Sequence, residues 1–258
     1  MKKHQHMKRT LTLLLALCLL FALSACKNVD APSDSAGITT AGTEHAADST
    51  PVPDTTPVPD TSSVPQTDAP STEAEPAITG RGVVDGDLYV NEGLKLQVKL
   101  PGDCFFYTEE QVAQANNMSA AMFEATDLAE AIAERGQLID MIFSRDNGDN
   151  VNVLIQPNNP ALAAYSMEQV FQLSEETYRS QFGAAGLELG TYETTTLRFL
   201  GEETTVLHMV LSNETMTVDE YQVWATELSE DYMAVITVTF ATEGGDPQPL
   251  LDAFGRID

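Results

Sequence analysis

Basic side chains are scarce in this sequence. Its 258 residues contain 13 Lys and Arg against 39 Asp and Glu, which gives a formal net charge of −26 at pH 7. Such a surface repels the phosphate backbone of nucleic acids and the anionic head groups of lipid membranes. Nucleic acid is therefore excluded as a partner, and any membrane contact has to come from something other than a basic surface.

Cysteines are too few for a disulfide framework. Of the three, Cys18 and Cys26 lie in and directly after an apolar N-terminal run, and only Cys104 lies in the remaining chain. No internal disulfide is therefore available. Two phenylalanines follow Cys104, which is typical of a buried thiol that acts as a small hydrophobe. The alternative, a catalytic thiol, would need a basic partner, and His208 is the only histidine downstream.

The sequence motifs of the common enzyme classes are absent. The chain contains no Gly-x-Ser-x-Gly, no Gly-x-x-x-x-Gly-Lys and no His-Glu-x-x-His. His208 alternates with Val206 and Val210, which is the pattern of one face of a strand, and we interpret it as a structural histidine rather than a general base. We therefore predict that the protein is not an enzyme and that it uses no cofactor.

The N-terminus carries a basic start followed by a short apolar run. Lys2, Lys3, Lys8 and Arg9 precede residues 11–25, which include no charged side chain. This pattern is typical of a secretory signal peptide, and the run is shorter than the about 20 apolar residues that a membrane-spanning helix needs. We therefore predict a signal peptide over residues 1–25.

The end of this run resembles a bacterial lipobox, because residues 23–26 are Leu-Ser-Ala-Cys. The resemblance implies cleavage between Ala25 and Cys26 and attachment of a diacylglyceryl group to the Cys26 sulfur. Two acyl chains are sufficient for stable membrane anchoring. The expected location is the extracytoplasmic face of the cell membrane of a Gram-positive bacterium. The alternative is an ordinary signal peptide followed by a chance cysteine.

Residues 26–79 have the composition of a disordered linker rich in Pro, Thr and Ser. They contain eight of the 13 prolines and no aromatic residue, and TPVPDT occurs at 50–55 and 56–61 with an altered copy at 62–67. Alternating prolines favour extended polyproline II and cannot form a ladder of backbone hydrogen bonds. Because few large apolar side chains are available for burial, we expect a spacer that spans ~40 Å as a coil and up to ~150 Å when extended.

Residues 80–258 have the composition of one folded domain, with every aromatic residue that lies outside the signal peptide. Alternation of apolar residues predicts strands at residues 139–143, 151–155, 207–211, 221–228 and 232–240. We expect residues 139, 141 and 143 to share one face. Residues 146–150, Asp-Asn-Gly-Asp-Asn, predict a hairpin with a type I′ turn.

Capping signals predict the helices of this domain. Helices are expected to begin after Thr108, Ser166 and Asp246, and a shorter helix is expected over residues 127–135. Thr108 and Ser166 each have a Gln three residues later, as in a capping box, and Gly136 is expected to end the shorter helix. Strands and helices in this order predict an α+β fold with a mainly antiparallel sheet flanked by helices.

The domain resembles PsbP-like lipoprotein domains. The resemblance rests on Gly82-Val-Val, Leu88-Tyr-Val-Asn, Gly93-Leu-Lys-Leu-Gln-Val and Pro101-Gly-Asp, which form a strand pair and a corner before the first helix. The order of the later elements continues it over about residues 82–257. The corner aromatic is Phe105 rather than Trp, which is a mild departure from the family pattern. The resemblance implies an α/β/α sandwich and, as in many members, a non-catalytic role in assembly or binding at a membrane.

Acidic and amide groups supply the few candidate binding residues. Asp146, Asp149 and Asn150 offer the oxygen ligands that a hard cation such as calcium prefers, but a hairpin turn explains the same residues and we predict no metal site. Trp224 is either a core residue or a platform on which a sugar or peptide stacks.

We expect a membrane-anchored, non-enzymatic lipoprotein that binds an envelope protein or assists its assembly. The alternative is a lipoprotein that binds a small ligand, such as a solute or a glycan, or a cation. A third possibility is a hydrolase that uses two carboxyl groups ~5 to 9.5 Å apart, a geometry that the sequence alone does not show.

Overall fold

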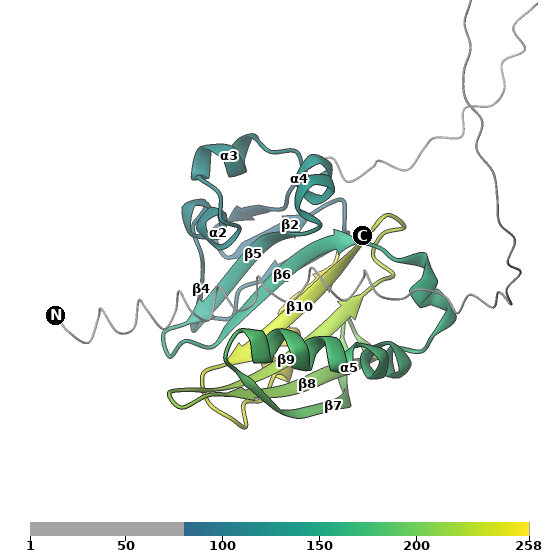
Figure 1. Ribbon diagram of the computed structural model, residues 1–258. Helices are drawn as coiled ribbons and strands as arrows, with labels where there is room; N and C mark the ends of the chain where they lie inside the picture. Colours follow the sequence, from purple (N-terminus) through teal and green to yellow (C-terminus); the bar gives the residue numbers. More distant parts are fainter. Residues whose placement is uncertain (1–79, 258) are drawn as a thin grey trace, which may run out of the picture. The chain divides into compact units, whose positions relative to one another are not determined.

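Antiparallel strands form two sheets in residues 80–257, the part of the chain that the structure, a computed structural model, describes (Figure 1). The predicted signal peptide over residues 1–25, its cleavage site at Ala25 and Cys26, and the predicted linker over residues 26–79 lie outside the described residues. Among the described helices, none has the length and apolar character required to span a membrane.

The larger sheet has seven strands. In order across the sheet they are β4 (Cys104–Phe106), β5 (Leu138–Arg145), β6 (Asn150–Pro157), β10 (Tyr232–Phe240), β9 (Thr217–Ala225), β8 (Glu202–Ser212) and β7 (Glu188–Phe199). The smaller sheet consists of β1 (Val83–Asp85), β2 (Leu88–Asn91), β3 (Leu96–Lys99) and β11 (Phe254–Arg256), also in this order. All neighbouring pairs are antiparallel.

Side-chain N-caps mark the start of the first four of the five α-helices in the described residues. These helices are α2 (Glu109–Ala115), α3 (Ala120–Ala125), α4 (Leu128–Arg135), α5 (Met167–Ala184) and α6 (Gln248–Leu251), with the 3-10 helix η1 (Pro160–Ala164) before α5. Thr108 and Ser166 form complete capping boxes, and Gly136 ends α4 with a φ of 80°. The last helix begins one residue later than predicted, because Pro247 is its N-cap. The predicted α+β class with a mainly antiparallel sheet flanked by helices is confirmed.

The hairpin predicted at residues 146–150 joins β5 and β6, but its turn is not type I′. In this loop only Gly148 takes a positive φ, of 100°, and its N–H donates to the Arg145 carbonyl. A type I′ turn needs positive φ at both central residues. That condition is met instead between β7 and β8, where Leu200 and Gly201 have φ of 52° and 86°.

A β-bulge at Asp140 changes the expected faces of β5. Ile139 and Met141 pair with consecutive residues of β6, and Asp140 has no partner residue in the ladder. The prediction that Ile139 shares a face with Met141 and Phe143 is therefore wrong, because one extra residue reverses the alternation. The bulge directs Asp140 out of the regular pattern, toward the helices and the smaller sheet.

The seven-stranded sheet is covered on both faces. On one face α5 packs against β7 and β8 (Figure 1), and its Phe171 ring meets the Trp224 ring of β9 edge-on, with centroids 5.3 Å apart. The smaller sheet covers the other face, where Phe254 of β11 lies 6.5 Å from Phe143 of β5. The short α6 contacts β7, and helices α2 and α4 contact β5.

Candidate functional site

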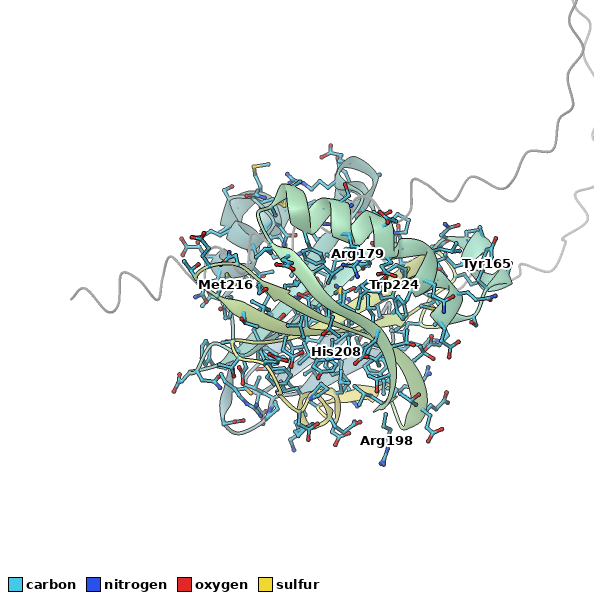
Figure 2. The ribbon with its side chains drawn as sticks, turned by 60° about the horizontal axis from the view of Figure 1, so that its bottom comes forward. Tyr165, Arg179, Arg198, His208, Met216 and Trp224 are labelled. Atoms are coloured by element: carbon cyan, nitrogen blue, oxygen red, sulfur yellow. The ribbon has the colours of Figure 1, made fainter. Side chains whose placement is uncertain are left out.

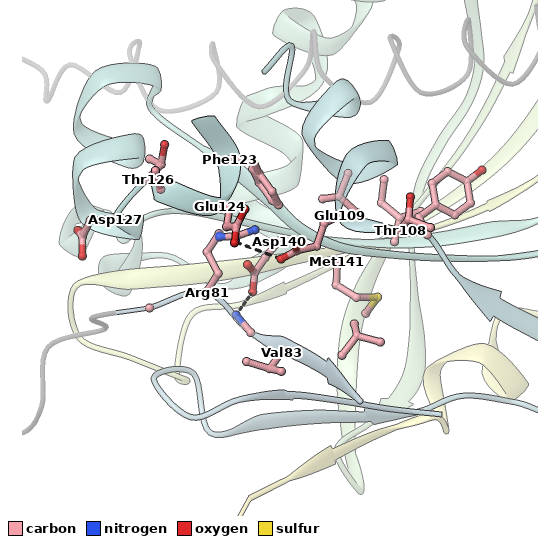
Figure 3. Close-up of a pocket in the computed structure, with 17 residues that line it drawn as sticks. Arg81, Val83, Thr108, Glu109, Phe123, Glu124, Thr126, Asp127, Asp140 and Met141 are labelled. Carbon is pink, nitrogen blue, oxygen red and sulfur yellow. Dashed lines mark hydrogen bonds and ion pairs between the residues drawn. The ribbon is translucent and has the colours of Figure 1, made fainter. Parts of the chain in front are cut away.

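A pocket of about 640 Å³ lies between the start of the smaller sheet, helices α2 and α3, and the bulged part of β5 (Figure 3). Its polar and aromatic lining side chains are Arg81, Tyr107, Thr108, Glu109, Phe123, Glu124, Thr126, Asp127 and Asp140. Four of these carry carboxyl groups and one carries a guanidinium. This balance favours a cationic ligand over an anionic one.

Side-chain caps and one asparagine fix the helices around the pocket. Thr108, Ser119 and Asp127 cap the N-termini of α2, α3 and α4. Asn116, directly after α2, donates from its Nδ2 to the Ile139 carbonyl and accepts from the Ile139 N–H at its Oδ1, both at 2.8 Å. Because this amide takes the place of a neighbouring strand at the edge of β5, it holds the helices beside the bulge.

Asp140 is the buried acid of the pocket, with 6% of its surface exposed. Its Oδ2 accepts hydrogen bonds from the Gly82 N–H at 2.8 Å, the Tyr89 hydroxyl at 2.5 Å and the Asn91 Nδ2 at 2.9 Å. Burial raises the pKa of Asp140, and these donors and the charge of Arg81 partly counteract that rise. Burial and the nearby Asp140 also raise the pKa of Tyr89, which keeps its hydroxyl a proton donor.

The second oxygen of Asp140, Oδ1, lacks the donors that Oδ2 has. Oδ1 is buried and has no hydrogen-bond partner within residues 80–257. A buried acceptor without a donor costs about 1–3 kcal/mol, and more when it is charged. Such an atom at the wall of a pocket therefore indicates a position where a ligand donor would be favourable.

Gly82 allows the backbone to come close to Asp140. A Cβ atom at this position would lie 2.2 Å from Cε2 of Tyr89, far inside the contact distance of two carbon atoms. Glycine is therefore needed for the Gly82 N–H to reach the Asp140 carboxylate while Tyr89 donates to the same oxygen.

Arg81 is the single basic group of the pocket. Its guanidinium carbon lies 3.7 Å from the centroid of the Phe123 ring, and one of its nitrogens lies 3.4 Å from Oε1 of Glu109 (Figure 3). Only 14% of its side-chain surface is exposed. Its charge also favours the ionised form of Asp140 and so lowers the pKa of that group. The pocket thus already contains a buried cation stacked on an aromatic ring.

Trp224 and His208 lie in the seven-stranded sheet and do not line this pocket (Figure 2). Trp224 is 5% exposed and packs against Phe171 of α5, so its ring faces the core rather than an open surface. The ring nitrogens of His208 lie 2.7 Å from Oδ1 of Asp219 and 3.2 Å from Oε1 of Glu193. Both nitrogens therefore have carboxylate partners in the arrangement of a structural histidine.

Asp146, Asp149 and Asn150 lie at the β5–β6 hairpin, away from the pocket lining. Oδ2 of Asp149 accepts from the Asn147 side chain at 2.8 Å, and its Oδ1 accepts from a backbone N–H of the strand end after β10. The hairpin thus uses both Asp149 oxygens. Within residues 80–257, no group of three or more His, Cys, Asp or Glu side chains is arranged to hold a metal ion.

A second buried polar cluster lies beneath α5. Oε1 of Glu220 accepts a hydrogen bond from the Gln222 Nε2 at 2.7 Å, and Gln222 in turn accepts from the Tyr178 hydroxyl at 2.9 Å and from the Trp224 indole at 3.4 Å. Glu220 is 5% exposed. Burial raises its pKa from 4.5 to about 7, and the bond from Gln222 opposes this rise.

Sequence reasoning missed Arg81 and Asp140, the two charged groups at the centre of the pocket. One signal was available, because Asp140 stands inside the otherwise apolar run Leu-Ile-Asp-Met-Ile-Phe at residues 138–143. A charged residue in such a run is either paired, neutral or part of a site. Arg81 gave no comparable signal, since an arginine just before a strand such as β1 is usually an exposed surface residue.

Comparisons with known proteins add a likeness of fold. No family model matches the chain, and no curated protein matches it. Among solved structures, the solution structure of cyanobacterial PsbP (CyanoP) from Synechocystis sp. PCC 6803 matches with a TM-score of 0.37 and 11% sequence identity, over 72% of this chain and 97% of that chain. These values are low, and no residue, partner or activity is transferred from that protein.

Proposed function

We propose that this protein is a non-enzymatic binding protein of the bacterial envelope, and that it binds a partner protein through the pocket around Asp140. In this proposal a lipid on Cys26 anchors the chain at the extracytoplasmic face of the membrane. Residues 26–79 then act as the spacer between the anchor and the binding domain. The lipobox resemblance and the proline-rich composition support the anchor and the spacer.

The observation that carries the proposal is the buried Asp140 oxygen without a donor, at the wall of a pocket that continues into an open strand edge. β1 is one of the two edge strands of the smaller sheet, and its Val83 and Val84 line the pocket while they are 67% and 45% exposed. An extended peptide that pairs with an edge strand gains main-chain hydrogen bonds and places side chains in adjacent pockets. Exposed apolar residues at such an edge favour a protein partner.

A small ligand is the second candidate, because about 640 Å³ is within the usual range of small-molecule sites, roughly 300–1,000 Å³. The open edge at β1 favours the protein partner, since a solute that is enclosed by the pocket would not form backbone hydrogen bonds with this strand. Both candidates use the same pocket and can be separated by experiment.

The test uses the full chain, purified in detergent and immobilised, to capture proteins from the solubilised envelope of the producing bacterium. Ala125 lines the pocket, so Ala125→Trp adds an indole to its wall. The matched control is Ala163→Trp, at an exposed residue of η1 that is not part of the lining.

We expect one saturable protein partner that the unmodified chain and the Ala163→Trp chain retain equally and that the Ala125→Trp chain loses. Equal capture by the Ala125→Trp chain would show that binding does not use this pocket. Failure of the unmodified chain to capture any saturable partner would contradict the protein-binding proposal.

A further inference from the structure

The niche that holds Arg81 shows which chemistry the pocket accepts. A planar cation lies on the face of Phe123, with its charge matched by Glu109 and its surface mostly removed from water. Arginine side chains stack on aromatic rings and pair with carboxylates because the guanidinium is flat, delocalised and weakly hydrated. A group of the same chemistry from another molecule would find the same contacts.

We infer that the pocket binds the basic side chain of an extended partner segment, whose guanidinium or alkylammonium group takes the place of Arg81 and donates to Oδ1 of Asp140. This inference rests on the proposed function, because it names the ligand chemistry of the same pocket.

Asp140 supplies the second, independent observation. Arg81 acts on Asp140 through its charge but makes no hydrogen bond to Oδ1, which has no donor among the described residues. Arg81 thus leaves one acceptor of the niche, Oδ1 of Asp140, without a hydrogen bond. A longer or deeper cation that reaches Oδ1 would gain a charge-assisted hydrogen bond, which is roughly twice as strong as a neutral one.

The charge balance of the pocket decides between ligand classes. The pocket has four carboxyl groups and Arg81 as its only basic group. If a cation replaces Arg81, the balance is preserved and the buried Asp140 keeps a compensating charge. If a neutral or anionic group replaced it, the buried Asp140 would lose its counter-charge, which is costly, whereas the other three carboxyl groups are exposed and stay solvated. The pocket therefore selects against such ligands.

The position of Arg81 in the chain makes its replacement practicable. Arg81 precedes β1 and belongs to no helix or strand. Its side chain can leave the niche by rotation of its own dihedral angles, while the Gly82 N–H keeps its bond to Asp140 and β1 stays paired with β2. The side chain then occupies the site without a ligand and is released when one binds.

The experiment measures binding to the full chain in detergent by isothermal titration calorimetry. The ligand probe is N-acetyl-arginine methylamide, which represents an arginine within a peptide. Its matched control is N-acetyl-citrulline methylamide, which has nearly the same shape and no charge. Free arginine is the third probe, because its α-carboxylate would face the acidic pocket and so separates a peptide source from a free amino acid.

Three variants accompany the unmodified chain, each first checked by thermal melting. Arg81→Gln empties the cationic niche, and Glu109→Gln removes the carboxylate that pairs with Arg81. Glu175→Gln is the control, because this carboxylate pairs with Arg179 on α5 and does not line the pocket. Asp140→Asn is avoided, since its uncharged oxygen would accept more weakly from Tyr89 and Asn91, which would change folding as well as ligand binding.

We expect the capped arginine to bind the Arg81→Gln chain at least tenfold more tightly than the unmodified chain, because it no longer has to displace a competing cation. In the Glu109→Gln chain the affinity should fall at least threefold, and in the Glu175→Gln chain it should not change. The citrulline analogue should bind at least tenfold more weakly than the arginine probe, and free arginine more weakly than the capped form.

Equal binding of the citrulline and arginine probes would overturn the inference, as would an Arg81→Gln chain that binds arginine no better than the unmodified chain. The two proposals fail separately. A partner that is captured through the pocket but not displaced by capped arginine leaves the protein-binding proposal intact and refutes the ligand class. Tight binding of capped arginine without any captured protein supports the ligand class and refutes the protein-binding proposal.

Discussion

Glu220 should make the folded domain less stable as the pH rises toward and through 7. Its carboxyl group is buried beneath α5, and burial raises its pKa from 4.5 to about 7. Although Gln222 donates a hydrogen bond to it, the Glu220 carboxyl group therefore binds its proton more strongly in the folded chain than in the unfolded chain. The stabilising contribution is complete below pH 4.5 and is lost as the pH approaches 7.

The size of this effect follows from the two pKa values. Between pH 4.5 and about 7 the unfolded chain has lost the proton of Glu220 while the folded chain still retains it. Over this window the free energy of unfolding falls by about 1.4 kcal/mol per pH unit, or about 3 kcal/mol in all. Above the folded pKa both states are ionised, and the contribution no longer changes.

The Glu220→Gln variant isolates this effect. An amide has a similar shape, its oxygen still accepts from Gln222, and it carries no charge at any pH in the window. At pH 4.5, the start of the window, the variant and the unmodified chain should have nearly equal stability. At pH 8.5 the variant should be more stable by about 3 kcal/mol, because it does not bury a carboxylate.

The assay is urea unfolding of the full chain at half-unit steps from pH 4.5 to 8.5, followed by Trp224 fluorescence. The quantity of interest is the difference in free energy of unfolding between variant and unmodified chain, since other titrating groups cancel in it. Glu214→Gln, at an exposed position between β8 and β9, should give a flat difference curve. A flat curve for Glu220→Gln as well would refute the argument from burial.

Three further predictions concern the anchor, the pocket support and the core. Cys26→Ala should move the full chain from the membrane fraction to the medium or the soluble fraction, and continued membrane association would exclude lipidation at this residue. Asn116→Ala should lower the free energy of unfolding by about 2–4 kcal/mol, because two backbone groups of buried Ile139 lose their partners; urea titration checks this. Trp224→Ala should cost about 3–5 kcal/mol through loss of its contact with Phe171, whereas Trp224→Phe should cost much less.

Features coded by short stretches of sequence could be predicted well. The capping boxes after Thr108 and Ser166 and the glycine end of α4 depend on side chains within four residues of the backbone groups that they satisfy. The position of the hairpin between β5 and β6 could likewise be predicted from its turn residues, although its turn type could not. Such features need no knowledge of distant parts of the chain.

Features that depend on pairing between distant segments could not be predicted. β11 contains three residues, and only its pairing with β3 at the other end of the domain makes it a strand. The bulge in β5 is defined by its register with β6, so it could not be inferred from the alternation of residues 139–143 alone. β9 begins at Thr217 rather than 221 because β8 and β10 extend the ladder on both sides.

The pocket depends both on local sequence and on contacts between distant segments, and the choice of aspartate at position 140 illustrates this. The three donors that reach its Oδ2 could also be accepted, though more weakly, by the oxygen of an asparagine, which costs less to bury than a carboxylate. An aspartate differs from an asparagine here only by its charge and by a second acceptor in place of a donor. The charge strengthens the hydrogen bonds from Gly82, Tyr89 and Asn91, and it also attracts Arg81. The second acceptor, Oδ1, serves none of these contacts, and it is the atom to which the proposed cationic ligand donates.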